Sequence, residues 1–77
     1  MEEVLEYLAR CLVDSPEEVS VESFEEDDGT LVLELHVADA DAGRVIGRGG
    51  RTVVALRTVM KACAVRHGRR VLVDVVD

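Results

Sequence analysis

The sequence contains no Trp, Asn or Gln and only one Pro, and it has no long run of apolar residues. A membrane-spanning helix needs roughly 18 such residues in succession, so none is predicted. The chain opens Met1, Glu2, Glu3 without the basic start and apolar stretch of a signal peptide, and we expect a cytoplasmic protein. Scarce proline and a hydrophobic fraction of 48% favour a packed globule over disorder. Residues 1–77 have room for one core and are predicted to form a single domain.

Cysteine is scarce too, with only Cys11 and Cys63. Both lie among apolar residues at helical spacing, which predicts reduced thiols in the core rather than a disulfide framework. Together with His36 and His67 they lack the C-x-x-C and H-x-x-x-H spacings of a zinc site, so no metal or other cofactor is predicted. No Ser-His-Asp, Cys-His or paired-carboxylate arrangement is suggested by spacing either, so we do not expect an enzyme.

Basic residues are nearly absent from the first half of the chain. Residues 1–43 hold fourteen acids and one base, a net charge of −13, whereas residues 44–77 hold eight bases and two acids, a net charge of +6. The overall charge of −7 alone would argue against a polyanionic partner. The asymmetry is a recognised hint of contact with nucleic acid or a membrane surface, although a solvated basic helix face balanced by an acidic neighbour gives the same pattern and is the commoner case.

Hydrophobic periodicity in the first half predicts one helix and a hairpin. Apolar residues at helical spacing over residues 2–13 indicate a helix, which the Asp14, Ser15, Pro16 sequence ends. Period-two alternation over residues 18–37 indicates a β-hairpin whose acidic turn, residues 25–28, is solvated and away from the glycine-rich stretch at residues 47–50. Phe24 falls out of step with this alternation and predicts a bulge or the end of a strand.

The second half is predicted to form two helices and a strand. Asp39 or Asp41 can cap a short helix over residues 40–46, and an amphipathic helix covers residues 51–66 up to a stop at Gly68. Residues 71–76 alternate as a strand. The order α-β-β-α-α-β predicts an α+β fold: an antiparallel hairpin, a third strand parallel to the second, and three helices on one face of this three-stranded mixed sheet. The other face, with Val32, Glu34 and His36, should meet solvent or a partner.

A glycine-rich turn, residues 45–53, separates the two C-terminal helices. It is not a P-loop, because the chain has no Gly-Lys pair, and it is not a dinucleotide fingerprint, because Thr52 stands where the third glycine would be. The pattern that fits is I-G-x-x-G between helices. This is the GxxG loop of KH domains, which clamps about four nucleotides of single-stranded nucleic acid.

The chemistry of this turn suits a sugar-phosphate backbone. Glycines at 47, 49 and 50 permit positive φ and close approach, and the first unsatisfied N–H groups of the next helix, at residues 51–53, attract a phosphate. Guanidinium groups at 44, 48 and 51 can each grip a phosphate in two hydrogen bonds. An ordinary helix-helix turn with incidental arginines is the alternative. The predicted RNA-binding residues are Arg44, Val45, Ile46, Gly47, Arg48, Gly49, Gly50, Arg51 and Thr52.

In its length, its element order and the run of residues 41–52, D-A-G-R-V-I-G-R-G-G-R-T, the chain resembles the KhpA-type small KH proteins of bacteria, which consist of a single type II KH domain. It departs from them in having Arg44 and Arg48 where Lys is frequent, which keeps the charge. The resemblance implies binding of single-stranded RNA through the loop and a groove formed by the flanking helices and neighbouring strand. It further implies a post-transcriptional regulator or RNA chaperone, a KhpB (Jag/EloR-type) partner, and self-association.

The predicted groove is aliphatic, because the only aromatic residues, Tyr7 and Phe24, are not beside the loop. Low sequence specificity is therefore expected. The bases would have to rest on apolar side chains. Val45, Ile46 and Val53, with Leu33 or Leu35 as a floor, could supply that surface, although residues of this kind more often belong to a core. The alternative function is a protein-interaction module with little RNA binding of its own, which would dimerise through an apolar patch on the outer sheet face, namely Val32, Leu72 and Val76.

Overall fold

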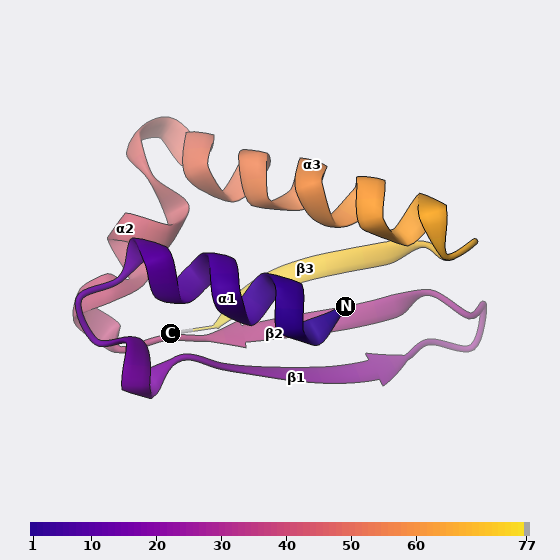
Figure 1. Ribbon diagram of the computed structural model, residues 1–77, viewed down its shortest axis with the longest axis horizontal. Coiled ribbons are helices and arrows are strands. Elements are labelled where there is room, and N and C mark those ends of the chain that lie inside the picture. The colour runs from indigo at the N-terminus through magenta and orange to yellow at the C-terminus, as the bar shows by residue number, and fades with distance from the viewer. Residues whose placement is uncertain (77) are drawn as a thin grey trace.

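A computed structural model describes residues 1–76 (Figure 1). Three short 3₁₀ turns, at residues 16–18, 39–41 and 48–50, connect the main elements. These elements follow the predicted order: α1 (Glu2–Leu12), β1 (Ser20–Glu25), β2 (Leu31–His36), α2 (Ala42–Ile46), α3 (Arg51–Arg66) and β3 (Val71–Val76). None of the helices in residues 1–76 is long and apolar enough to cross a membrane.

The sheet has the predicted topology, with β2 between its two neighbours. Strands β1 and β2 pair antiparallel and β2 and β3 pair parallel. The three helices lie on one side of this sheet (Figure 1). Phe24 pairs with Val32 in an unbroken register, so the predicted bulge is absent from β1 and the strand ends one residue later. Phe24 breaks the period because it belongs to the outer face, opposite the helices.

The core lies between the helices and the inner face of the sheet. Strand β2 contributes Leu33 and Leu35, and α3 contributes the stripe predicted from its spacing, of which Met60 is fully buried. Cys63 is only partly buried and Cys11 is exposed, so the prediction of core thiols is wrong for Cys11. Helix α1 buries Leu5 and Ala9. Because Cys11 follows Ala9 by two residues, it lies about 200° around the helix from that buried line.

Gly68 ends α3 as predicted and turns the chain toward the hairpin. Its φ is +66°, and the N–H groups of Gly68 and Arg69 donate to the carbonyls of Val65 and Ala64 at 3.1 and 2.8 Å. This pattern is a Schellman motif. It brings Arg69 to within 2.6 Å of the Glu25 carboxylate. The acidic hairpin turn is therefore partly neutralised by Arg69, which precedes β3, rather than only solvated as predicted.

The adjacent Asp28 shows the same pairing. The backbone N–H of Thr30 donates to its carboxylate at 2.9 Å, and Arg70 lies 3.5 Å away. The hydrogen bonds from Thr30, with a smaller contribution from Arg70, lower the pKa of Asp28 below its ordinary value. The negative charge of the hairpin turn therefore lies at one end of the molecule, opposite the connection between α2 and α3 (Figure 1).

Asp41 does not cap α2 with its side chain, contrary to the prediction, and neither does Asp39. The Asp41 side chain is 2% exposed and points back to the end of α1. There the backbone N–H groups of Asp14 and Ser15 donate to its two carboxylate oxygens at 3.1 and 3.0 Å. A buried carboxylate thus ties the end of α1 to the start of α2, because those N–H groups need an acceptor once α1 has ended.

Replacing Asp41 with Asn should therefore destabilise the protein. The amide oxygen can accept one N–H group, but the amide nitrogen faces the other and leaves it without an acceptor. We expect the free energy of unfolding to fall by about 1–3 kcal/mol, measured by urea denaturation. Asp39→Asn is the matched control, because Asp39 is exposed, and it should unfold like the parent protein. Equal stability of the two variants would contradict this role for Asp41.

Candidate nucleic-acid interface

The connection between α2 and α3 is built from glycines in conformations that other residues avoid. The φ angles of Gly47, Gly49 and Gly50 are +77°, +65° and +77°. A Cβ atom at residue 47 would lie 2.2 Å from the Thr52 hydroxyl oxygen and 2.8 Å from its backbone nitrogen. Gly47 is therefore required by the close packing of the first turn of α3 against the end of α2.

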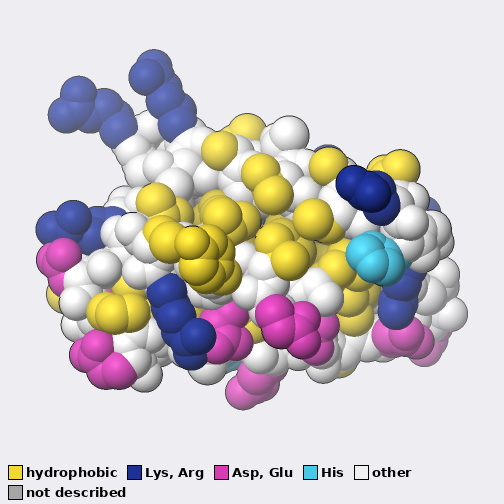
Figure 2. Space-filling view, viewed as in Figure 1, with side chains coloured by type: hydrophobic (Ala, Val, Ile, Leu, Met, Phe, Trp, Pro, Cys, Tyr) yellow, Lys and Arg dark blue, Asp and Glu magenta, His cyan; other side chains and the backbone are white. Residues whose placement is uncertain are grey.

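The tip of this loop is open to a ligand. A Cβ atom at Gly49 or Gly50 would meet no other atom within 4 Å, and the side chains of Arg48 and Arg51 are exposed. Lys and Arg side chains project from the surface at the end of the molecule where α2 joins α3 (Figure 2). One expected donor is already used, because the N–H of Arg51 donates to the carbonyl of Arg48 within the 3₁₀ turn. A phosphate would thus meet arginine side chains and open backbone, with no side chain capping the start of α3.

Ion pairing divides the basic residues into two groups. Four of the nine have a carboxylate partner within 4.0 Å among residues 1–76: Arg10, Arg44, Arg69 and Arg70. The other five form no ion pair within that part of the chain, and all of them lie on the loop or α3: Arg48, Arg51, Arg57, Lys61 and Arg66. The predicted site residue Arg44 belongs to the first group, since its guanidinium lies 3.0 Å from Asp14 and 3.9 Å from Asp41.

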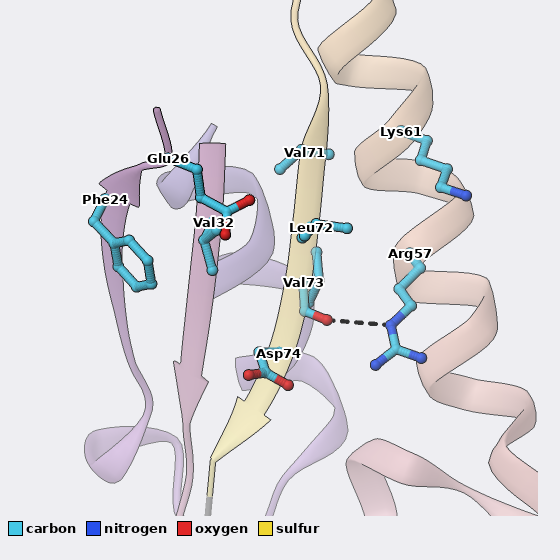
Figure 3. Close-up of a pocket in the computed structure, with 9 residues that line it drawn as sticks. All are labelled: Phe24, Glu26, Val32, Arg57, Lys61, Val71, Leu72, Val73 and Asp74. Atoms are coloured by element: carbon cyan, nitrogen blue, oxygen red, sulfur yellow. Dashed lines mark hydrogen bonds between the residues drawn. The ribbon is translucent and has the colours of Figure 1, made fainter. Parts of the chain in front are cut away.

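Two of the unpaired bases line a hollow beside the edge strand β3. Arg57 and Lys61 project from α3 on one side, and Phe24 and Leu72 rise from the outer face of the sheet on the other (Figure 3). The hollow has a volume of about 470 Å³. The Arg57 Nε donates to the carbonyl of Val73 at 3.2 Å, which fixes the guanidinium at the rim. Phe24 and Leu72 are 49% and 52% exposed, so they offer apolar surface.

A family model described as KhpA/KhpB, KH domain, matches residues 2–75. The chain belongs to this family. It is 45% identical over 76 residues to a protein of Clostridium acetobutylicum named RNA-binding protein KhpA, a match that covers 99% of this chain and 100% of the relative. The protein of the same name from Halalkalibacterium halodurans is 46% identical over 78 residues, with both chains covered completely. That from Treponema pallidum is 42% identical over 76 residues, covering 99% of this chain and 94% of the relative.

Within this KH domain, most of the aliphatic residues considered for base contact belong to the core, which was the alternative for each of them. Val45, Leu33 and Leu35 are 0% exposed and Val53 is 8% exposed. Ile46, at the end of α2, is 43% exposed and remains available. The patch predicted on the outer face of the sheet is smaller than expected, because Val32 is only 7% exposed between its neighbours on β1 and β3.

Sequence reasoning did not assign this hollow to the RNA site, although it placed Val32 and Leu72 on the outer face of the sheet; the lining also includes Phe24, Arg57, Lys61, Glu26 and Asp74. The sequence could have indicated Arg57 and Lys61, because they are four residues apart and therefore share a face of the helix that begins at the loop. Phe24 had no such signal, since only the strand register brings residue 24 into one row with residues 32 and 72.

Proposed function

We propose that this protein binds single-stranded RNA through the α2–α3 loop and the hollow between α3 and β3. The observation that carries the proposal is that, among residues 1–76, the five bases without an ion pair all lie on the loop or α3, in a chain whose net charge is −7. A strongly acidic protein repels polyanions on average, so the bases on the loop and α3 that form no ion pair among residues 1–76 are a local attraction for RNA. The relatives named RNA-binding protein KhpA support the same function.

The proposed roles follow from exposure and pairing. Arg48 and Arg51 hold phosphates, and the open backbone of Gly49 and Gly50 lets the strand approach. Arg57 and Lys61 hold the strand farther along α3, about 9 and 15 Å from Arg51 at the helical rise. Phe24, Leu72 and Ile46 offer apolar surface to the bases. Few groups here can read base edges, so the protein would serve RNAs of varied sequence, as a post-transcriptional regulator or RNA chaperone does.

The remaining predicted site residues act on the loop rather than on RNA in this proposal. Gly47 and Thr52 close the turn by their mutual contact, and Val45 anchors α2 in the core. Arg44 is held by Asp14 and Asp41, which places its charge at the end of α1.

The salt dependence of binding tests this assignment. Each phosphate contact in single-stranded RNA contributes about 0.7 to the slope of log affinity against log salt. Arg51→Gln and Lys61→Gln should each reduce the slope by about that amount and weaken binding to all sequences alike, in fluorescence anisotropy titrations of an oligonucleotide of about twenty bases. Arg69→Gln is the control, because Glu25 already neutralises Arg69. A reduced slope for the Arg69 variant, with the slopes of the other two variants unchanged, would mean that RNA binds at the opposite end of the molecule.

We also propose that the protein associates with a second KH domain, either another copy of itself or a KhpB (Jag/EloR-type) protein. Hydrophobic side chains gather on the face formed by α1 and α3 (Figure 2). A groove of about 240 Å³ lies there, and Leu12 and Val59 on its rim are 36% and 44% exposed. The hydrophobic effect favours covering such a surface with a partner. Two linked RNA sites would raise the affinity for long RNA by a factor of about 10² without new contacts.

Replacing Val59 with Glu should abolish this association, because a charge would be buried in an apolar interface. The oligomeric state is measured by light scattering, alone and with a KhpB-type protein added. Val65→Glu is the matched control on the same helix, since Val65 is 76% exposed and lies outside the groove. A protein that is monomeric alone and with the KhpB-type protein, or a Val59 variant that associates normally, would refute the proposed interface.

A further inference from the structure

The outer face of the sheet carries a row of carboxylates that crosses all three strands. Glu22 on β1 pairs with Glu34 on β2, and Glu34 in turn pairs with Asp74 on β3. Like charges directly opposite one another on a sheet are destabilising. No base lies within 4.0 Å of these three carboxylates among residues 1–76, apart from the imidazole of His36. The row therefore concentrates negative charge that the protein itself does not neutralise.

His36 adds a nitrogen donor beside this row, in the neighbouring cross-strand position between Ser20 and Val76. It follows Glu34 by two residues on the same strand, so both side chains are on the outer face. Its Nε2 atom is shielded from solvent and has no hydrogen-bond partner, although the side chain as a whole is 34% exposed. The Glu34 carboxylate oxygen lies 4.0 Å from Nε2. That distance is too long for a hydrogen bond, so a shielded polar atom faces carboxylates across a gap.

The structure assigns Glu22, Glu34 and His36 as a binding site for a divalent metal ion of the zinc kind, and Zn²⁺ is the ion that we propose. One donor atom from each residue lies within 4.8 Å of the other two. Zinc binds imidazole nitrogen and carboxylate oxygen at about 2.0–2.2 Å, so donors on one ion lie roughly 3–3.5 Å apart. Small side-chain rotations close the remaining gap, and a water molecule completes the coordination.

The donor set selects among metals. Imidazole nitrogen with carboxylates suits zinc and its first-row neighbours, whereas calcium and magnesium prefer oxygen ligands alone. Asp74 lies beside Glu34 and adds negative charge without belonging to the group of three. The zinc site that the sequence argued against combined the cysteines with both histidines. The site proposed here could not be found from the spacing of ligands in the sequence, because Glu22 comes close to Glu34 and His36 only through the pairing of β1 with β2.

Zinc binding to the full chain tests the site. The protein is stripped with EDTA and titrated with Zn²⁺ in competition with a chromophoric chelator, and one ion should bind per chain. His36→Ala and Glu34→Gln should each weaken binding at least tenfold, because each removes a ligand. The control is His67→Ala, which removes the other histidine, on the far end of α3, and should bind as the parent does. Zinc at a hundred times its dissociation constant should raise the parent's Tm by about 10 °C or more.

A second measurement covers the case in which a variant does not fold. In the unaltered protein, zinc should shift the Nε2 resonance of His36 in long-range ¹H–¹⁵N spectra and leave that of His67 in place. The site is refuted if zinc fails to compete with the chelator, or if His67 responds and His36 does not. Binding that survives His36→Ala at full strength refutes it equally. RNA binding does not enter these measurements, so the result is independent of the proposed function.

Discussion

Replacing Arg48 and Gly49 together with Asp should lower the affinity for single-stranded RNA by about 100-fold or more. The change removes one guanidinium and places two carboxylates where the phosphates are proposed to lie. A charge-assisted hydrogen bond contributes about 1.5–3 kcal/mol, and repulsion adds to its loss, so at least about 3 kcal/mol of binding free energy should disappear. Anisotropy titrations at fixed salt measure the effect.

The same variant should fold normally. Arg48 is exposed, and a side chain at residue 49 would meet no atom within 4 Å. The φ of Gly49 is +65°, in a region that Asp tolerates better than most residues. We therefore expect a small change in Tm and unchanged self-association by light scattering, which would separate RNA binding from the interaction role.

The chain offers a closely matched control at its other end. Gly29 also has a positive φ, +86°, with no atom within 4 Å of a Cβ, and the exposed Arg70 lies beside that turn. The double variant Gly29→Asp, Arg70→Asp makes the same change in net charge and in backbone type, far from the α2–α3 connection (Figure 1). Its RNA affinity should fall only slightly at physiological salt, where exposed charges are screened within about 8 Å. Equal losses in both double variants would mean that only overall charge matters, and the loop assignment would be wrong.

The elements of this fold could be predicted because each depends on a local pattern. The alternation of apolar and polar residues over 18–37 predicted the hairpin, and the apolar stripe over 51–66 predicted the helix α3 that the structure has. The role of Asp41 could not be predicted in this way, because its partners lie 26 and 27 residues earlier in the chain. As a residue preceding a helix it is a reasonable cap, and only the tertiary fold offers its carboxylate two better donors.

The same limit applied to the candidate site. In the sequence, Arg44 and Arg51 are equivalent, each beside the glycines. The fold brings Asp14 to Arg44 and leaves Arg51 without a carboxylate partner among residues 1–76. The burial of each residue could not be predicted from the sequence either. Val45 and Ile46 are neighbours in the chain, yet Val45 is 0% exposed and Ile46 is 43% exposed. Sequence could identify the loop, but the division of its residues between contact and support required the packing.

Replacing Gly47 with Ala should be the most damaging single change in the loop. The backbone there has φ +77° and ψ 169°, a conformation that essentially only glycine adopts. The added Cβ would also lie 2.2 Å from the Thr52 hydroxyl oxygen and 2.8 Å from its backbone nitrogen. The hydroxyl can rotate away, but the nitrogen belongs to the first turn of α3 and cannot move without that helix. We expect the free energy of unfolding to fall by about 3 kcal/mol and Tm by about 15 °C.

Gly43→Ala separates this steric effect from the general effect of adding a methyl group near the loop. Gly43 lies in α2, and its Cβ would meet no atom within 4 Å. Alanine there reduces the entropy of the unfolded chain and favours the helix, so stability should rise by up to about 1 kcal/mol. Thermal unfolding of both variants gives the comparison, and RNA binding below the lowered Tm shows whether the loop still forms. A Gly47 variant as stable as the Gly43 variant would mean that the turn has another conformation available, and that the contact with Thr52 does not fix the loop.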